Sequence, residues 1–180
     1  MPIHHLPANN DTVRVGFISR DFPDVLTIDS GDTVIAEAWS MLGNRGDASL
    51  DVETARQLRA ADPARGPHSM TGPVHVRGAQ PGQVLEVGIG EILLPDHGLN
   101  ITPPGGGRGI LADRFPDSHL IHFSLDTESM TTRLADKVTV PLKPFLGIMG
   151  VAPAVAGLFS SVEPGPFGGN IDCPDLVAGT

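Results

Sequence analysis

The chain has no tyrosine and only one cysteine and one tryptophan among its 180 residues. A single cysteine, Cys173, excludes an internal disulfide bond and fits a reducing compartment. Basic residues are also few, because 12 Lys and Arg stand against 21 Asp and Glu, for a formal net charge of -9. The basic residues are scattered along the chain, and the electrostatic field of a negatively charged protein repels a phosphate backbone. We therefore expect no nucleic-acid partner.

The sequence also lacks a convincing membrane segment. The N-terminus has neither a basic start nor an apolar run, so it does not resemble a signal peptide. Residues 144–162 carry no charge and are long enough to span a bilayer. Prolines, glycines and serines interrupt this stretch, and in lipid each break would leave backbone groups without partners. We interpret it as irregular chain buried in a soluble fold and expect a cytoplasmic protein without membrane contact.

What the sequence does contain is period-two alternation of apolar residues, which is typical of β-strands. The clearest case is the run 83–94, where Leu85, Val87 and Ile89 share one face. Two turns are also legible, because Gly31 and Gly82 stand where a tight turn needs a positive φ. Similar alternation predicts further strands at residues 26–28, 34–38, 121–125 and 138–142.

One helix is predicted, over residues 52–61. Its apolar residues recur at helical spacing after Ser49 or Asp51 as an N-cap, and the stretch ends before Pro63. Residues 95–117 are crowded with proline and glycine and predict a long loop.

Together these elements predict a mainly β chain. We expect an antiparallel β-sandwich or barrel-like fold with one short helix and long Gly/Pro-rich loops. Because 180 residues are the size of one ordinary domain, we expect a single unit over residues 1–180.

Two segments framed by glycine and proline carry polar residues suited to a functional site. In residues 66–73, His68 lies between two Gly-Pro corners. In residues 163–172, glycines allow close backbone approach, and Asn170 and Asp172 point to the same side of an extended chain. The two segments would supply an imidazole, an amide and a carboxylate.

Structural roles are the alternative for these residues. A lone histidine is more often a hydrogen-bonded structural residue than a ligand, and the seven histidines are not at zinc-site spacings. Asn170 and Asp172 can also close a turn through their own backbone. Cys173 beside the second segment would permit a thiol mechanism, although a small buried residue is the simpler interpretation.

The order of these segments resembles the acetamidase/formamidase family of amide hydrolases. The most specific part of the resemblance is the run 143–153. The other parts are residues 27–34, 66–73 and 78–85, followed by Pro164-Gly165-Pro166, residues 168–172 and Asp175-Leu176.

The resemblance implies hydrolysis of formamide and acetamide to ammonia and a carboxylate, by a homo-oligomer that uses a divalent metal ion, zinc or calcium. It implies His68 and Asp172 as catalytic residues, and Asn170 and Gly169 as substrate-binding residues. His68, Asn170 and Asp172 would be the metal ligands. Such an ion would polarise the amide carbonyl and lower the pKa of its bound water to about 7.

The resemblance covers only the N-terminal portion of the family pattern. Family members continue into a segment with a Gly-Asp-Gly-Glu-like core that has no counterpart here. We therefore expect residues 1–180 to be an N-terminal portion that is incomplete at its C-terminus. A site built from both halves would keep half of its ligands, which leaves the activity of the isolated chain open.

A non-catalytic β-barrel module that binds a ligand or forms an oligomer is the alternative function. Residues 26–34 with Trp39 also resemble the entry strands of cupredoxin-like domains. Copper would require His and Met close after the cysteine, and Cys173 is followed by Pro174-Asp175-Leu176.

Overall fold

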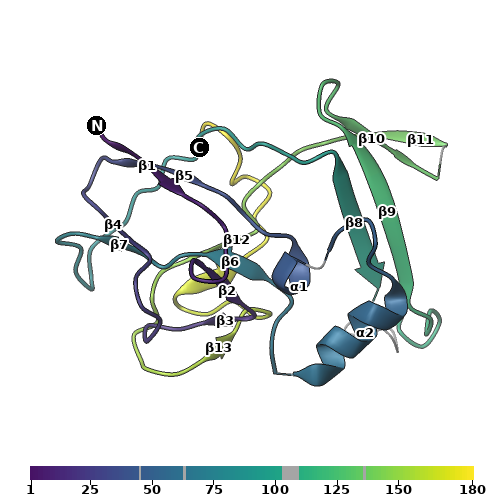
Figure 1. Cartoon of the computed structure of the whole chain (residues 1–180), viewed down its shortest axis with the longest axis horizontal. Helices are drawn as coiled ribbons and strands as arrows, with labels where there is room; N and C mark the ends of the chain where they lie inside the picture. The colour runs from purple at the N-terminus through teal and green to yellow at the C-terminus, as the bar shows by residue number, and fades with distance from the viewer. Residues whose placement is uncertain (45, 63, 103–109, 136) are drawn as a thin grey trace. The chain divides into compact units, whose positions relative to one another are not determined.

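The computed structural model describes residues 1–44, 46–62, 64–102, 110–135 and 137–180. Its elements are mostly short strands (Figure 1). The chain divides into two compact units. Unit 1 consists of Met1–Asn44, Ala64–Glu91 and Phe145–Thr180, and unit 2 of Arg45–Pro63 and Ile92–Pro144. That both belong to one folding domain stays a prediction.

Unit 1 is built from strand pairs. Two pairs are parallel: β1 (Ile3–Leu6) with β5 (Thr33–Ala36), and β4 (Leu26–Ile28) with β7 (Val74–Val76). The antiparallel pairs are β2 (Val13–Val15) with β6 (Ser69–Thr71), β3 (Phe17–Ile18) with β13 (Phe159–Ser160), and β12 (Ile148–Gly150) with β14 (Gly168–Asn170). A short helical turn, α1 (Met41–Asn44), precedes unit 2 in the chain.

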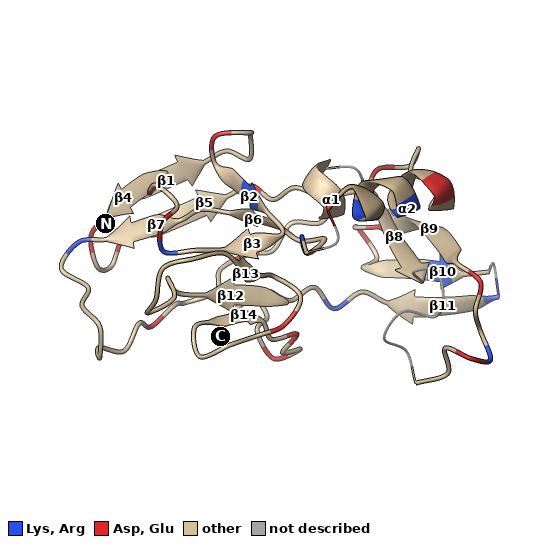
Figure 2. Cartoon of the chain, turned by 90° about the horizontal axis from the view of Figure 1, so that it is seen from below, with Lys and Arg blue, Asp and Glu red and all other residues tan. Residues whose placement is uncertain are grey.

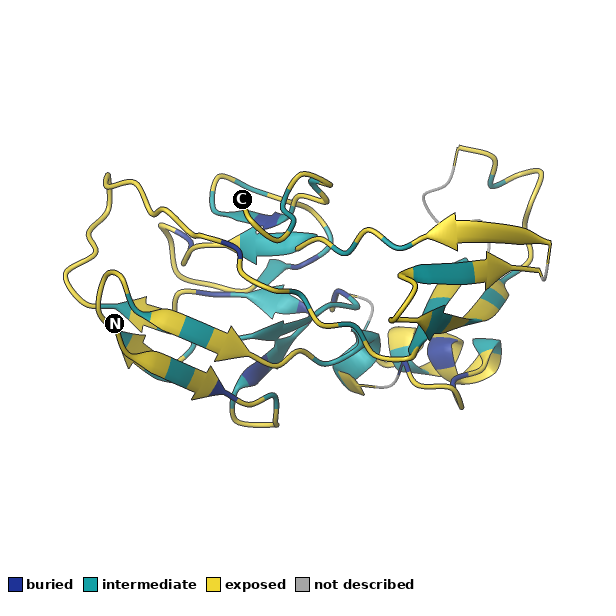
Figure 3. Cartoon of the chain, turned by 90° about the horizontal axis from the view of Figure 1, so that it is seen from above, coloured by how far each residue is buried: buried dark blue, intermediate teal, exposed yellow. Residues whose placement is uncertain are grey.

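Few side chains of unit 1 are buried, as Figure 3 shows. Among the described residues, its buried hydrophobic side chains are Leu6, Val13 and Ile89. Leu6 ends β1 and Val13 begins β2.

Unit 2 is a four-stranded antiparallel sheet and one helix. The sheet has the order β11-β10-β9-β8, formed by Val138–Pro141, Thr131–Leu134, His119–Asp126 and His97–Thr102. The helix α2 (Val52–Ala61) begins after the N-cap Asp51. Ala55 in α2 and Leu50 just before it are buried.

The prediction of a mainly β fold with a short helix at residues 52–61 is confirmed. Strands also form at four of the predicted places, and Gly31 and Gly82 have the expected positive φ. The pairing is mostly antiparallel, with the two parallel pairs β1–β5 and β4–β7 as exceptions. The strands of the described residues do not close into a barrel.

Three predictions about single segments are wrong. Residues 83–94 form no strand despite their alternation, because no neighbouring strand pairs with them among the described residues. Residues 97–102 form β8 rather than a loop, because the long strand β9 supplies a partner in register. Residues 144–162 are irregular apart from β12 and β13, as predicted, but many of them are exposed rather than buried. The predicted loop residues 103–109 lie outside the described residues.

Two properties of the whole chain bear on its partners. Lys and Arg are spread thinly over the chain (Figure 2), in agreement with its acidic balance. Within the described ranges, no helix combines the length and apolar character that crossing a membrane requires.

The cap of α2 gives a testable pH dependence. A carboxylate oxygen of Asp51 accepts a hydrogen bond from the Thr54 N–H at 2.7 Å, and this bond lowers the pKa of Asp51 below its ordinary value of 3.8. A carboxyl group with a depressed folded-state pKa stabilises the fold above its ordinary pKa, and this stabilisation is lost as the pH falls through the folded-state pKa. We predict that Asp51→Ala lowers the melting temperature at pH 7 and has a smaller effect below pH 3. Asp62→Ala at the other end of α2 is the control, and an Asp51→Ala effect independent of pH would contradict the assignment.

Candidate active site

The candidate site is organised around the backbone of Gly16. The Gly16 carbonyl accepts hydrogen bonds from the Gly66 N–H at 3.1 Å and from the Ser161 N–H at 2.9 Å, and the Gly16 N–H donates to the His68 carbonyl at 2.8 Å. Gly16 has a φ of 80°, and a Cβ there would stand 2.6 Å from the Gly66 carbonyl oxygen. Only glycine fits this position, which joins three segments distant in sequence.

His68 is the first of the predicted site residues, and it is half-buried directly before β6. Its Nδ1 atom lies 2.9 Å from the Oγ atom of Ser161, whose side chain is fully buried. A Cβ on Gly66 would collide with this Oγ atom, so the Gly-Pro corner before His68 makes room for the hydroxyl. The contact orients the ring, with Nδ1 directed at the Ser161 hydroxyl.

Asn170 ends β14, and its side chain is oriented by the same segment that holds His68. The Nδ2 atom of Asn170 donates to the Val162 carbonyl at 3.0 Å. The preceding Gly169 is buried with a φ of 99°, and a Cβ there would stand 3.2 Å from Cδ1 of Ile18 in β3. The predicted close approach of backbone at these glycines is therefore present.

Asp172 is held at a different place. It is exposed and has a φ of 46°, a left-handed conformation that aspartate tolerates better than most residues. Its N–H donates to the Gly147 carbonyl at 2.9 Å. A Cβ on Gly147 would stand 2.8 Å from Oδ1 of Asp172, so the carboxylate lies over Gly147.

Two of the predicted residues contact the same short segment: His68 contacts Ser161, and Asn170 contacts Val162. The third, Asp172, contacts Gly147 instead. The sequence analysis missed Ser161, because a serine 93 positions from its histidine partner leaves no local pattern. Gly16 was also missed, although a glycine directly after a β-strand is a recognisable signal for a bulge or close approach.

The described residues do not provide a metal site. Within the described parts of the chain, no group of three or more His, Cys, Asp or Glu side chains could hold a metal ion. His68 and Asp172 offer two strong donors and Asn170 an amide oxygen, whereas zinc sites use three or four protein ligands and calcium takes six to eight oxygen ligands. The described residues therefore do not form a complete site for zinc or calcium.

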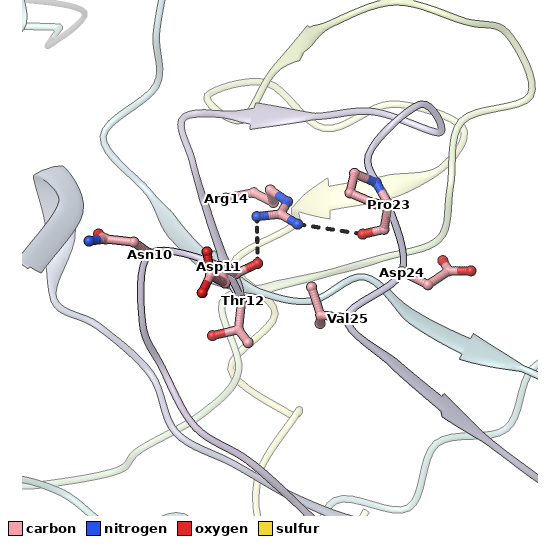
Figure 4. A pocket seen from close by; sticks show the side chains of 7 residues that line it. All are labelled: Asn10, Asp11, Thr12, Arg14, Pro23, Asp24 and Val25. Atoms are coloured by element: carbon pink, nitrogen blue, oxygen red, sulfur yellow. Dashed lines mark hydrogen bonds between the residues drawn. The ribbon is translucent and has the colours of Figure 1, made fainter.

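A surface pocket is lined by none of these residues (Figure 4). Its volume is about 470 Å³, and Arg14 lies in its wall. The Arg14 guanidinium donates to the Asp11 carbonyl at 2.9 Å and to the Pro23 carbonyl at 3.5 Å, so it braces two loops. The pocket contains none of the predicted site residues; it is lined by Asn10, Asp11, Thr12, Arg14, Pro23, Asp24 and Val25.

The other ring contacts in the chain are structural. Nε2 of His97 lies 2.9 Å from Nδ1 of His122, and Nε2 of His122 lies 2.9 Å from the Leu50 carbonyl oxygen. A carbonyl can only accept, so Nε2 of His122 donates to it, and this chain of bonds ties the start of α2 to the β8–β9 pair. Cys173 is a half-buried free cysteine.

Comparison with known proteins gives consistent results. The model of the acetamidase/formamidase family matches residues 9–163. A candidate formamidase of Schizosaccharomyces pombe is 29% identical over 138 residues. The acetamidase structure from Bacillus halodurans superposes with a TM-score of 0.81 at 26% identity, and that from Yersinia enterocolitica with 0.76 at 28% identity.

These proteins are much longer than the chain. The alignment with the S. pombe protein covers 74% of this chain and 33% of that protein. The two acetamidase structures cover 97% and 98% of this chain, and 54% of each of them is matched. The chain thus spans about a third of the curated relative and about half of the solved structures.

The glycines of β14 give a prediction about packing. Gly168 has a φ of 84°, and a Cβ there would stand 2.6 Å from the Met149 carbonyl oxygen, whereas Gly82 has a φ of 89° and open space around it. Both Gly→Ala changes carry left-handed strain of about 1–2 kcal/mol. We predict that Gly168→Ala lowers the free energy of unfolding by roughly 1–3 kcal/mol more than Gly82→Ala, because it also overpacks the β12–β14 pair. Urea unfolding of both variants measures this, and equal losses would contradict the close approach.

Proposed function

The chain belongs to the acetamidase/formamidase family, and on this premise we propose that it hydrolyses short aliphatic amides, formamide and acetamide, to ammonia and the carboxylate. The observation that carries the proposal is the family match over residues 9–163. This range contains His68 and Ser161, whose side chains meet inside unit 1.

His68 is the proposed proton-transfer residue. An amide is a poor electrophile, so hydrolysis needs a base for the attacking water and an acid for the departing nitrogen. With Nδ1 directed at Ser161, Nε2 would take a proton from the water as its oxygen bonds to the carbonyl carbon. The same nitrogen would return the proton as the C–N bond breaks and ammonia leaves.

The segment after β14 is proposed to position the substrate. Asn170, oriented by Val162, and the backbone of Gly169 would contact the amide. A donor aimed at the developing oxyanion typically contributes roughly 3 kcal/mol to the transition state. Asp172 would serve as a second proton-transfer group or as a ligand.

A divalent ion, zinc or calcium, remains part of the proposal only with additional ligands. His68, Asn170 and Asp172 are the residues of this chain that would contribute, and the described residues do not complete the set. The remaining donors would have to come from outside them. Homo-oligomer formation and a cytoplasmic location are likewise proposed.

A second candidate function is a non-catalytic module that binds a ligand or joins an oligomer. The lack of a complete set of metal ligands among the described residues favours it. Assays of turnover separate the two candidates directly.

The first test is ammonia release from formamide and acetamide by the purified chain and by His68→Gln. Glutamine can still hydrogen bond to Ser161 but cannot shuttle a proton, so we predict a loss of about 10²–10⁴-fold in rate. His75→Gln, which changes an exposed histidine of β7, is the matched control and should retain the activity. Wild-type release no faster than that of His68→Gln would contradict the proposal and favour the non-catalytic module.

The second test concerns the orientation of His68. Removing the partner that fixes a functional imidazole typically costs about 10–100-fold in activity. We predict a loss of this size in Ser161→Ala, whereas Ser160→Ala, one residue earlier in β13, should lose less than threefold. Melting temperatures of both variants show how much of the loss is unfolding, and full activity of a folded Ser161→Ala protein would remove Ser161 from the site.

A further inference from the structure

Three consecutive residues of unit 1 have a left-handed backbone conformation, although only one of them is a glycine. Leu42 has φ 58° and ψ 33°, Gly43 has φ 72° and ψ 47°, and Asn44 has a φ of 65°. Glycine adopts this conformation freely and asparagine tolerates it, whereas in leucine the Cβ atom crowds the following carbonyl oxygen. We call residues 42–44 the left-handed turn. Its backbone is strained at Leu42, so contacts with the rest of the unit have to hold it.

The left-handed turn is bonded to the two residues that flank His68. The Leu42 N–H donates a hydrogen bond to the Pro67 carbonyl at 2.6 Å. The Gly43 N–H donates to Oγ of Ser69 at 3.1 Å. The helical turn α1, to which these residues belong, accordingly lies beside β6 (Figure 1). The left-handed turn therefore contacts the chain directly before and directly after the imidazole.

The half-buried Ser69 side chain makes a second hydrogen bond on this side of β6. Its hydroxyl donates to the Ser40 carbonyl at 2.7 Å while its oxygen accepts from the Gly43 N–H. The same Ser40 carbonyl accepts from the Asn44 N–H at 3.2 Å. One hydroxyl thus uses both its donor and its acceptor capacity to connect β6 with the two ends of the segment 40–43.

The backbone of His68 is held from the opposite direction by Gly16. The Gly16 N–H donates to the His68 carbonyl, whereas the Pro67 carbonyl and the Ser69 hydroxyl bond to the left-handed turn. The imidazole can reach Ser161 in a fixed orientation only if the backbone that carries it is fixed as well. A misplacement of about 1 Å at a reacting group can cost about 100-fold in rate.

We propose that Ser69 is a positioning residue of the candidate active site. Its hydroxyl holds the left-handed turn against the strain at Leu42, and the turn fixes the backbone on both sides of His68. Ser69 acts through His68 and takes no part in making or breaking bonds. The proposal deepens the proposed amide hydrolysis and rests on His68 as its proton-transfer residue. Strained backbone is concentrated at active sites, where the surrounding structure has to hold it in place.

The test compares two variants that each remove one hydroxyl from β6. Ser69→Ala removes the hydrogen bonds to Gly43 and Ser40. Thr71→Val is the matched control, because the Thr71 hydroxyl also donates to a backbone carbonyl, that of Glu37 at 2.6 Å, rather than bonding to the left-handed turn. Melting temperatures of both variants show how much stability each hydroxyl contributes.

The first readout is the ¹⁵N chemical shift of Nδ1 of His68 in the chain labelled at histidine. The difference between this shift and that of free histidine reports the bond to Ser161. We expect the difference to decrease at least twofold in Ser69→Ala and less than 1.2-fold in Thr71→Val. The measurement needs no turnover, so its result stands whether or not the chain hydrolyses amides.

A double variant tests the part played by backbone strain. Leu42→Gly removes the crowded Cβ atom, so the left-handed turn no longer depends on the Ser69 hydroxyl. We expect Leu42→Gly alone to keep the Nδ1 shift of the unaltered chain. Added to Ser69→Ala, it should restore at least half of the lost difference. General damage to β6 would not be repaired by a change in the turn.

The second readout is ammonia release from formamide. In Ser69→Ala we expect kcat to fall about 10–100-fold, because a misplaced ring slows proton transfer, while KM changes less than threefold. Thr71→Val should keep both values within threefold. Absence of release by the unaltered chain would contradict the proposed hydrolysis, and the Nδ1 shift alone then decides the positioning role.

Two results would overturn the proposal. One is an Nδ1 shift in Ser69→Ala equal to that of the unaltered chain. The other is a decrease that Thr71→Val shares or that Leu42→Gly fails to repair, since the hydroxyl would then only support β6. Should Ser69→Ala fail to fold, Ser69→Cys takes its place with the same expected direction, because a thiol is a weak donor and a weak acceptor.

Discussion

The carbonyl of Gly16 accepts two backbone hydrogen bonds, and the candidate site depends on this junction. One bond comes from Gly66, beside the His68 corner, and the other from Ser161, directly after β13. No side chain can be added at Gly16 or Gly66 without a collision. Two missing Cβ atoms thus allow segments far apart in sequence to meet, and the buried Ser161 hydroxyl then reaches the His68 ring.

The segment that begins at Ser161 also contacts the predicted substrate-binding residue Asn170. Val162 follows Ser161 and accepts from Asn170, so one segment orients both an imidazole and an amide. Such orientation by neighbouring groups is what a hydrolytic site requires, because the functional atoms must be held before the substrate arrives. Within the part of the chain that the structure describes, this junction does not supply a full metal ligand set.

The sequence correctly predicted the turns and the helix cap, because these features depend on residues that are neighbours in the chain. Gly31 and Gly82 adopt the positive φ that their turns need, and Asp51 caps the helix at 52–61. The alternation at residues 84–91 shows which side chains would share a buried face, but a strand also needs a partner, and the sequence cannot say whether one is present. His68 was identified through its Gly-Pro frame and the family resemblance. Its bond to Ser161 was not, because tertiary contacts between distant residues have no periodicity to detect.

We propose that His68 and Asn170 face one small amide together, and nuclear magnetic resonance tests this arrangement most directly. Acetamide is titrated into the chain labelled with ¹⁵N, and the ring nitrogens of His68 and the side-chain amide of Asn170 are followed. We predict that Nε2 of His68 and Nδ2 of Asn170 shift with one common dissociation constant, while Nδ1 of His68 keeps the signature of its bond to Ser161. Shifts confined to other parts of the chain, such as the pocket beside Arg14, would contradict it.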